Sequence, residues 1–392
     1  MTAASMPFVR RVVLSLAVAL MLAPLAARAD FDLDTTARNA ILLDATTGQV
    51  LYEKAADERI APASISKLMT VYVLFEKLSN GSLKLTDTFP VSVGVWKKWR
   101  KLDGSTMFLN AGQRVTVENL IQGIIVQSGD DACDTVAEGL AGSQDAYAKG
   151  LNDKAAQLGL KDSHFVDASG WPDPEQYMTV RDMAHLAQLI IDRFPQYYHY
   201  FAEKAFTFNG VHQENRNMLL GQVPGVDGLK TGHVDASGYS MVASEKRGDL
   251  RLIAVISGTN STVARAREGE KLLSWGFTNY QAYTLAKQGQ QMDTANVWLG
   301  EQNTVPLVAA KTVTVLAKRS DRAKMVAKVI YKDPVPAPIA KGQPIAVLQI
   351  TGIQDKPIEV PLLAGQAVDQ LGGFARIKMA LSQWMWGPPP AK

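Results

Sequence analysis

The sequence predicts a mixed α/β unit of about 250 residues followed by a small all-β domain. Apolar runs typical of strands lie at both ends of the first 280 residues, with a block of helix-like segments between them. From about Thr284 the chain changes to short β-type runs separated by proline and glycine. Hydrophobic residues make up 47% and charged residues 20% of the 392, as in ordinary globular proteins. We expect the early and late strands to pair in one sheet.

The N-terminal residues 1–29 have the pattern of a secretory signal peptide. An Arg-Arg pair at 10–11 precedes an apolar run at 12–25, and Ala-Arg-Ala at 27–29 is a small-x-small cleavage site. A retained membrane helix is disfavoured because the apolar run is short for a bilayer. Removing the three arginines of this segment from the 41 basic residues leaves 38, equal to the 38 acidic ones. The mature chain is then neutral, and nothing suggests a nucleic-acid partner.

The α/β unit is expected to span residues 30–280. It opens with a β-hairpin over 40–52, and a helix follows whose apolar positions recur from Leu68 to Leu78. Residues 97–104 are basic and are expected to form a loop. Thr116 is placed to N-cap the next helix. Further helices are expected near 155–160, 179–190 and 272–275, and strands at 239–243 and 252–257.

The all-β domain is expected over 281–367, and residues 368–392 form a separate tail. Within it, Phe374, Ile377, Leu381, Trp384 and Met385 share one helical face. The tail is too short and polar to span a bilayer, but such a helix can lie in the membrane interface. The alternative is a terminal helix packed on the β-domain.

Cysteine and histidine usage argues against disulfides and metals. Cys133 is the only cysteine, so no internal disulfide can form. The five histidines show no metal-ligand spacing. We expect no metal and no cofactor, and a lone cysteine here is most simply a small buried hydrophobe.

Three short motifs occur in order along the chain. They are Ser64-x-x-Lys67, Ser128-x-Asp130 and Lys230-Thr231-Gly232. Ser64 and Lys67 lie one helical turn apart, and an amine beside a hydroxyl can activate it as a nucleophile. Each motif alone is weak evidence, since such patterns also occur on solvated surfaces. As a set they resemble the three elements of the active-site-serine penicillin-recognising enzymes.

Over nearly its full length the chain resembles the low-molecular-mass penicillin-binding proteins of the type-5 subgroup, which are serine-type D-alanyl-D-alanine carboxypeptidases. The resemblance extends to Pro62-Ala63-Ser64, Gln127-Ser128-Gly129, Asp131-Ala132-Cys133, Asn215-Arg216-Asn217, Asp227–His233 and Leu272-Leu273-x-Trp275-Gly276-Phe277. It implies a β-lactamase/transpeptidase-like catalytic domain with an antiparallel sheet and a helical cluster. It also implies a periplasmic enzyme attached peripherally to the inner membrane by its tail.

The implied reaction removes the terminal D-alanine from peptidoglycan stem pentapeptides during cell-wall maturation, with a role in cell shape and with β-lactams as acylating inhibitors. Ser64 is the expected nucleophile, Lys67 the base and Ser128 a proton relay. Burial and a second cation at Lys230 favour a neutral Lys67. The expected substrate-binding residues are Asp130, Lys230, Thr231, Gly232, His233, Arg216 and Arg265. Backbone N–H groups of Ser64 and His233 would form the oxyanion hole, and the Thr231 hydroxyl with an arginine would hold the substrate carboxylate.

Asp130 departs from the family pattern, which has asparagine at this position. An asparagine amide can donate to a substrate carbonyl, whereas an ionised aspartate only accepts. Two alternatives follow: Asp130 pairs with Lys67 and weakens the base, or it is protonated and donates as asparagine does.

Three rival functions remain on the sequence alone. A β-lactamase needs a carboxylate that activates water, and Glu175 is the one candidate. A wall-binding scaffold would have lost turnover through Asp130. A DD-endopeptidase is a close variant, but those relatives typically lack the β-domain and tail.

Overall fold

A computed structural model of the chain describes residues 9–13, 33–354, 356–373, 377 and 381. These residues divide into two compact units, one formed by Asp32–Thr278 and the other by Asn279 onward together with the N-terminal residues. Most of the expected signal peptide and tail helix lies outside the described residues. Within the described ranges, none of the helices is both long enough and apolar enough to cross a membrane.

The first unit is built on a five-stranded antiparallel sheet with the order β3-β2-β10-β9-β8. Its strands are β2 (Asn39–Asp44), β3 (Val50–Lys54), β8 (Val226–Val234), β9 (Gly238–Arg247) and β10 (Leu250–Thr259). β2 and β10 pair from Asp44 opposite Leu252 to Asn39 opposite Ser257. The expected pairing of early with late strands is therefore confirmed. All six residues of β2 are buried because helices cover both faces of the sheet.

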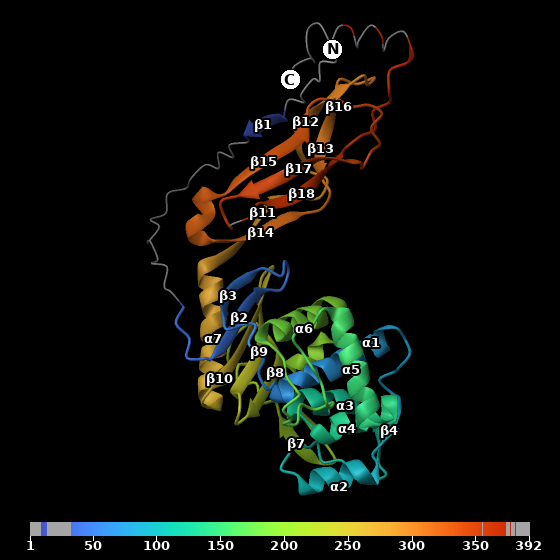
Figure 1. Cartoon of the computed structure of the whole chain (residues 1–392), viewed down its shortest axis with the longest axis vertical. Helices are drawn as coiled ribbons and strands as arrows, with labels where there is room; N and C mark the ends of the chain where they lie inside the picture. The colour runs from blue at the N-terminus through green and yellow to red at the C-terminus, as the bar shows by residue number, and fades with distance from the viewer. Residues whose placement is uncertain (1–8, 14–32, 355, 374–376, 378–380, 382–392) are drawn as a thin grey trace. The chain divides into compact units, whose positions relative to one another are not determined.

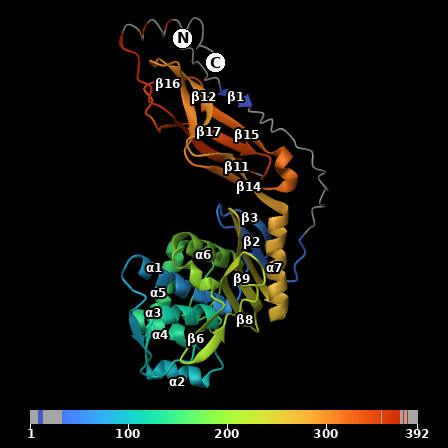
Figure 2. The same ribbon diagram turned by 180° about the vertical axis from the view of Figure 1, so that it is seen from behind.

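Helices form the two layers on either side of this sheet. Figures 1 and 2 show α7 (Thr262–Asn279) on one face, where Gly276 approaches the side chains of Leu42 and Leu252. The other helices gather on the opposite face, around a core that includes Ile41, Leu43 and Val255. They are α1 (Lys67–Ser79), α2 (Val93–Lys101), α3 (Val117–Gln122), α4 (Asp130–Ala141), α5 (Gln144–Leu158) and α6 (Val180–Arg193). Two small antiparallel sheets complete the unit: β4 (Thr88–Pro90) pairs with β5 (Arg114–Thr116) across the segment that contains α2, and β6 (Ala205–Phe208) forms a hairpin with β7 (Val211–Glu214).

The prediction of a loop over residues 97–104 is wrong for residues 97–101, because α2 continues to Lys101. The Ser92 hydroxyl caps α2 by accepting from the Val95 amide at 3.0 Å. On its inner side Trp99 is buried and donates its indole N–H to Asp134 at 2.7 Å. Four cationic side chains suggested a loop, but buried Val95 and Trp99 and the ion pair of Lys98 with Asp134 hold this helix on the unit.

The second unit is an all-β domain, as expected. A seven-stranded sheet has the order β1-β15-β17-β18-β13-β12-β16, and β11 pairs with β14 in a separate ribbon. The strands are β11 (Tyr280–Ala286), β12 (Gln291–Trp298), β13 (Thr304–Ala309), β14 (Val313–Lys318), β15 (Val326–Lys332), β16 (Val335–Pro336), β17 (Pro344–Thr351) and β18 (Ile358–Ala364). β1 (Val9–Val13) lies within the predicted signal peptide and pairs with β15. Alternating residues such as Val305, Leu307 and Ala309 are buried in a core of their own.

Candidate active site

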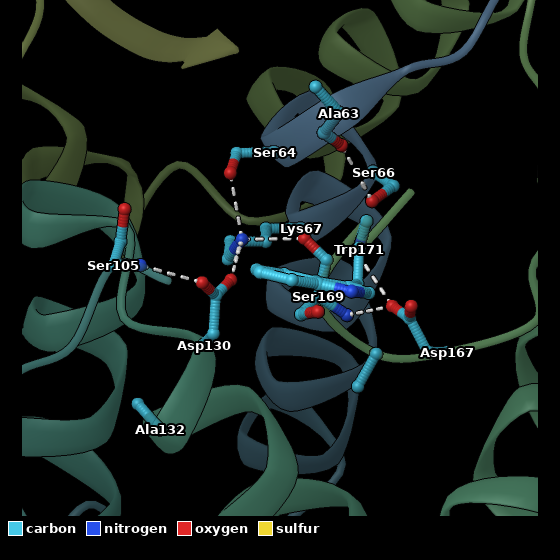
Figure 3. Close-up of polar contacts among 12 residues, drawn as sticks. Ala63, Ser64, Ser66, Lys67, Ser105, Asp130, Ala132, Asp167, Ser169 and Trp171 are labelled. Carbon is cyan, nitrogen blue, oxygen red and sulfur yellow. Dashed lines mark hydrogen bonds and ion pairs between the residues drawn. The ribbon is translucent and has the colours of Figure 1, made fainter. Parts of the chain in front are cut away.

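Ser64 lies in a short 3-10 turn, Ala63–Ser66, that leads directly into α1. This geometry places the Lys67 side chain against Ser64, with Nζ donating to Oγ at 2.8 Å (Figure 3). Lys67 is completely buried, whereas Ser64 is only half-buried and opens onto a pocket. The spacing of three residues therefore brings a protected amine to an accessible hydroxyl.

Lys67 has three acceptors around its amine. Besides Ser64, its Nζ lies 2.6 Å from a carboxylate oxygen of Asp130 and 2.5 Å from the carbonyl oxygen of Ser169 (Figure 3). A lysine ammonium carries three N–H donors and no acceptor, so this arrangement matches the charged form. Of the two alternatives for Asp130, the geometry is that of the ion pair.

The second motif follows a break in helical geometry. The chain leaves α3 through one wide π-helical turn, Gly123–Gln127, and Ser128 then takes a left-handed conformation with φ of 66°. Ser128 is buried, and its Oγ has no hydrogen-bond partner within the part of the chain that the structure describes. Such a turn beside a buried, unpaired hydroxyl is characteristic of functional sites.

Asp130 begins α4 and forms two hydrogen bonds with Ser105, which lies in the segment between α2 and β5. Its amide donates to the Ser105 carbonyl at 2.7 Å, and its second carboxylate oxygen accepts from the Ser105 amide at 2.8 Å. The Ser105 hydroxyl in turn accepts from the Arg216 guanidinium at 2.7 Å. Ser105 thus connects the second motif to Arg216, and no sequence pattern pointed to it.

The third motif lies on β8, the edge strand of the sheet nearest the Ser64 turn. A Cβ at Gly232 would lie 3.2 Å from the carbonyl oxygen of Pro62 and 2.8 Å from Oγ of Ser240, so a larger residue would push β8 and the Ser64 turn apart or displace Ser240. Thr231 and Lys230 are both buried. Burial, reinforced by the cations Lys67 and Arg216, holds the pKa of Lys230 well below its ordinary value.

Two arginines meet beside this strand. Arg265 donates to the carbonyl oxygens of Gly232 at 3.4 Å and Arg216 at 3.1 Å. Burial, with the charge of Arg216, lowers the pKa of Arg265 to about 10. Its Nε has no partner among the described residues. A buried guanidinium with an unused donor, next to a second one, is a natural receptor for a carboxylate.

These groups surround an open pocket of about 760 Å³. Of the residues expected from the sequence, Ser64, Asp130, Arg216, Thr231, Gly232, His233 and Arg265 line it. Lys67, Ser128 and Lys230 are buried. The His233 side chain is exposed and stacks on Tyr239 with 3.9 Å between ring centroids.

The loop that follows Asp167 supplies groups that the sequence did not identify. The Asp167 carboxylate accepts from the amides of Ser169 at 2.5 Å and Gly170 at 2.6 Å, which aims the Ser169 carbonyl at Lys67 (Figure 3). Trp171 forms part of the pocket wall and packs edge-on against Trp99, with 5.2 Å between the ring centroids. The Asp-x-Ser-Gly pattern of a side-chain-capped turn was the available signal.

Glu175 and Cys133, two residues considered in the sequence analysis, do not line the pocket. Glu175 is exposed and does not belong to the residues that surround the pocket. Cys133 is fully buried, and burial raises the pKa of its thiol well above the ordinary value. In the described part of the chain, no group of His, Cys, Asp or Glu is arranged to hold a metal ion.

A half-buried serine beside a buried lysine, facing a strand with a second lysine, defines a serine hydrolase that works without histidine. Comparison with known proteins specifies the family. Residues 25–261 match the model of D-alanyl-D-alanine carboxypeptidases of peptidase family S11, and residues 280–370 match the C-terminal domain of penicillin-binding protein 5. The chain belongs to this family of serine carboxypeptidases, the type-5 low-molecular-mass penicillin-binding proteins.

Individual relatives agree with this assignment. D-alanyl-D-alanine carboxypeptidase DacC of Escherichia coli K12 is 38% identical over 357 residues, which cover 89% of each chain. The crystal structure of penicillin-binding protein 5 from Haemophilus influenzae matches with a TM-score of 0.78 at 34% identity, covering 87% of this chain and 99% of that one. Penicillin-binding protein D2 from Listeria monocytogenes, solved in its ampicillin-bound form, matches with a TM-score of 0.57 at 28% identity and covers 63% of this chain and 99% of that one. The rival functions are not favoured by these similarities.

Proposed function

We propose that this enzyme removes the terminal D-alanine from peptidoglycan stem pentapeptides through an acyl-enzyme on Ser64. The observation that carries the proposal is the 2.8 Å contact between Ser64 Oγ, which lines the active-site pocket, and the buried Lys67 amine. The match to the D-alanyl-D-alanine carboxypeptidase family supports it. The Ser64 oxygen attacks the carbonyl carbon of the penultimate D-alanine, and the bond to the terminal D-alanine nitrogen breaks. Water then hydrolyses the ester.

Lys67 is the proposed general base. It must lose one proton before it can take the proton of Ser64, and it is completely buried. The ion pair with Asp130 opposes this change because a carboxylate stabilises the ammonium. The buried, unpaired Ser128 hydroxyl is the proposed relay that passes the proton to the leaving nitrogen.

The remaining residues are proposed to bind the substrate. Backbone N–H groups of Ser64 and His233 would stabilise the negative oxygen of the tetrahedral intermediate. The Thr231 hydroxyl, with Arg216 and Arg265, would hold the terminal carboxylate. The negative charge of the carboxylate would offset the repulsion between the two neighbouring guanidinium groups. Gly232 keeps this strand close to Ser64, and Lys230 lies behind it.

We infer that β-lactams acylate Ser64 and that the enzyme acts in the periplasm, where it contributes to cell-wall maturation and cell shape. The signal-peptide pattern of residues 1–29 supports export. Ile377 and Leu381, two described residues of the tail, have side chains exposed by 61% and 53%, which favours a membrane-facing helix over one packed on the β-domain.

Membrane fractionation tests the tail. The full mature chain is expected with the membranes, and a chain ending at residue 372 is expected in the soluble fraction because it lacks the apolar face. Unchanged sedimentation of the shortened chain would remove the anchor from the proposal.

Release of D-alanine from an acyl-L-Lys-D-Ala-D-Ala tripeptide tests the reaction. The wild-type chain is expected to release it, and Ser64→Ala is expected to lose at least about 10³-fold in rate because no other residue replaces the nucleophile. Labelled penicillin should remain covalently attached to the wild type and not to Ser64→Ala. Equal release by both proteins would overturn the assignment of Ser64.

A further inference from the structure

A second cleft, of about 320 Å³, is lined in part by residues that directly follow the active-site segment in the sequence. The segment that joins α2 to β5 forms both: Asp103, Gly104 and Ser105 line the active-site pocket, while Thr106, Phe108 and Asn110 line the second cleft. From α2 the cleft receives Trp96 and Arg100. The two hollows share no lining residue, but this one segment of the chain lines both of them.

Phe108 occupies the edge of this cleft in an unfavourable conformation. Its φ is 65°, a left-handed value that bulky residues rarely adopt, and its side chain is 48% exposed. The neighbouring Met107 and Leu109 are buried. The chain thus turns an aromatic ring outward between two core residues, and such outliers are concentrated at functional positions.

Asp131, which directly follows the second motif, holds this conformation. Its two carboxylate oxygens accept from the amides of Met107 at 2.9 Å and Leu109 at 3.1 Å, on either side of Phe108. The Phe108 carbonyl accepts from the Asn209 side chain at 2.9 Å. Burial raises the pKa of Asp131 to about 6. A buried carboxylate committed to two loop amides indicates that the position of Phe108 is built into the fold.

The facing side of the cleft is cationic and aromatic. The Arg100 guanidinium stacks over the Trp96 ring, 4.9 Å from its centroid. α2 also carries Lys97, Lys98 and Lys101 and no acidic residue, and of these Lys98 is paired with Asp134. The half-buried ring of Trp96, the exposed ring of Phe108, the Asn110 side chain and the Arg100 guanidinium line the same cleft, and they complement an anionic ligand with apolar ring faces and hydroxyl groups.

We propose that this cleft is an accessory subsite for the carbohydrate–peptide polymer that carries the scissile peptide. Sugar rings would pack on Trp96 and Phe108, and carboxylates of neighbouring peptides would pair with Arg100. The proposal rests on the proposed function. A polymer is favoured over a lipid surface because the cleft is concave, has polar groups and is formed by the same segment that lines the catalytic pocket. The enzyme then prefers polymeric substrate to a short peptide.

The test compares two substrates with the full mature chain, the acyl-tripeptide and isolated sacculi that retain pentapeptides. Trp96→Ala, Arg100→Ala and Phe108→Gly are each expected to lower D-alanine release from sacculi roughly five- to tenfold. Their kcat/KM for the tripeptide should stay within about twofold of wild type, because none of them contacts the catalytic groups. Peptide-free glycan strands should inhibit the wild type on sacculi only.

Phe108→Gly separates binding from folding. Glycine adopts φ of 65° without strain, so the thermal unfolding midpoint should be unchanged or higher while turnover of sacculi falls. Ala55→Gly is the matched control, since Ala55 is exposed with φ of 45°, and it should leave both substrates unaffected. Lys246→Ala controls for removal of an exposed cation elsewhere on the unit.

Equal losses on both substrates, or no loss on sacculi, would overturn the proposal. The proposal would also be overturned if the three variants lost binding to anionic phospholipid vesicles but kept their turnover of sacculi. That result would assign the cleft to membrane binding. If the wild type released no D-alanine from either substrate, the proposed reaction would fail. Co-sedimentation of wild type and variants with sacculi would then decide the subsite independently.

Discussion

Gly170→Ala is expected to lower kcat/KM for D-alanine release on the order of a hundredfold and to destabilise the protein by about 2–4 kcal/mol. A Cβ at this position would lie 2.0 Å from the Ala63 carbonyl oxygen and 2.3 Å from Ser66 Oγ. Gly170 also has φ of 84°, which disfavours any side chain. The loop must move away from the Ser64 turn, and the Ser169 carbonyl then loses its contact with Lys67. Urea denaturation and tripeptide hydrolysis measure the two effects.

Gly142→Ala is the matched control for this prediction. Gly142 ends α4 with φ of 78°, but a Cβ there meets nothing within 4 Å. It should carry only the conformational penalty, about 1 kcal/mol, and retain full activity. If Gly170→Ala behaved like Gly142→Ala, the close contact between the loop and the Ser64 turn would not control catalysis.

Asp130→Asn and Asp130→Ala are expected to differ sharply. Asparagine keeps an oxygen for the Ser105 amide and places an N–H donor where the carboxylate now meets Lys67 at 2.6 Å. That donor suits a neutral amine and a substrate carbonyl, so kcat/KM for the tripeptide should be unchanged or raised. Alanine leaves the Ser105 amide without its acceptor and provides no donor, and a drop on the order of a hundredfold is expected.

Steady-state kinetics of the two variants on the tripeptide decide this prediction. A large loss in Asp130→Asn would show that the carboxylate itself is needed and that its pairing with Lys67 assists the reaction. Full activity in Asp130→Ala would show that neither the link to Ser105 nor a donor at this position contributes. The thermal midpoint of each variant separates loss of folded protein from loss of rate.

The sequence was sufficient for features that depend on local spacing. Residues three apart predict the contact between Ser64 and Lys67, and apolar runs at both ends of the catalytic unit predict a sheet closed by early and late strands. Features created by distant segments could not be predicted. Ser169 meets Lys67 only because Asp167 and Gly170 shape a loop a hundred residues downstream. The α2 helix was missed because its single buried tryptophan has a partner in α4.

The pairing of β2 with β10 has a consequence for how the enzyme is made. β10 is the strand that joins β2 to β9, and through β9 to β8 with Lys230 and Thr231. A growing chain has therefore already produced Ser64, Lys67 and Ser128 while the sheet that completes their site is still unfinished. Closing so long a loop is slow relative to local helix formation. A nascent chain that stops before Leu250 contains every motif residue but lacks the strand that joins β2 to β9, so the active site can be completed only after β10 has been synthesised.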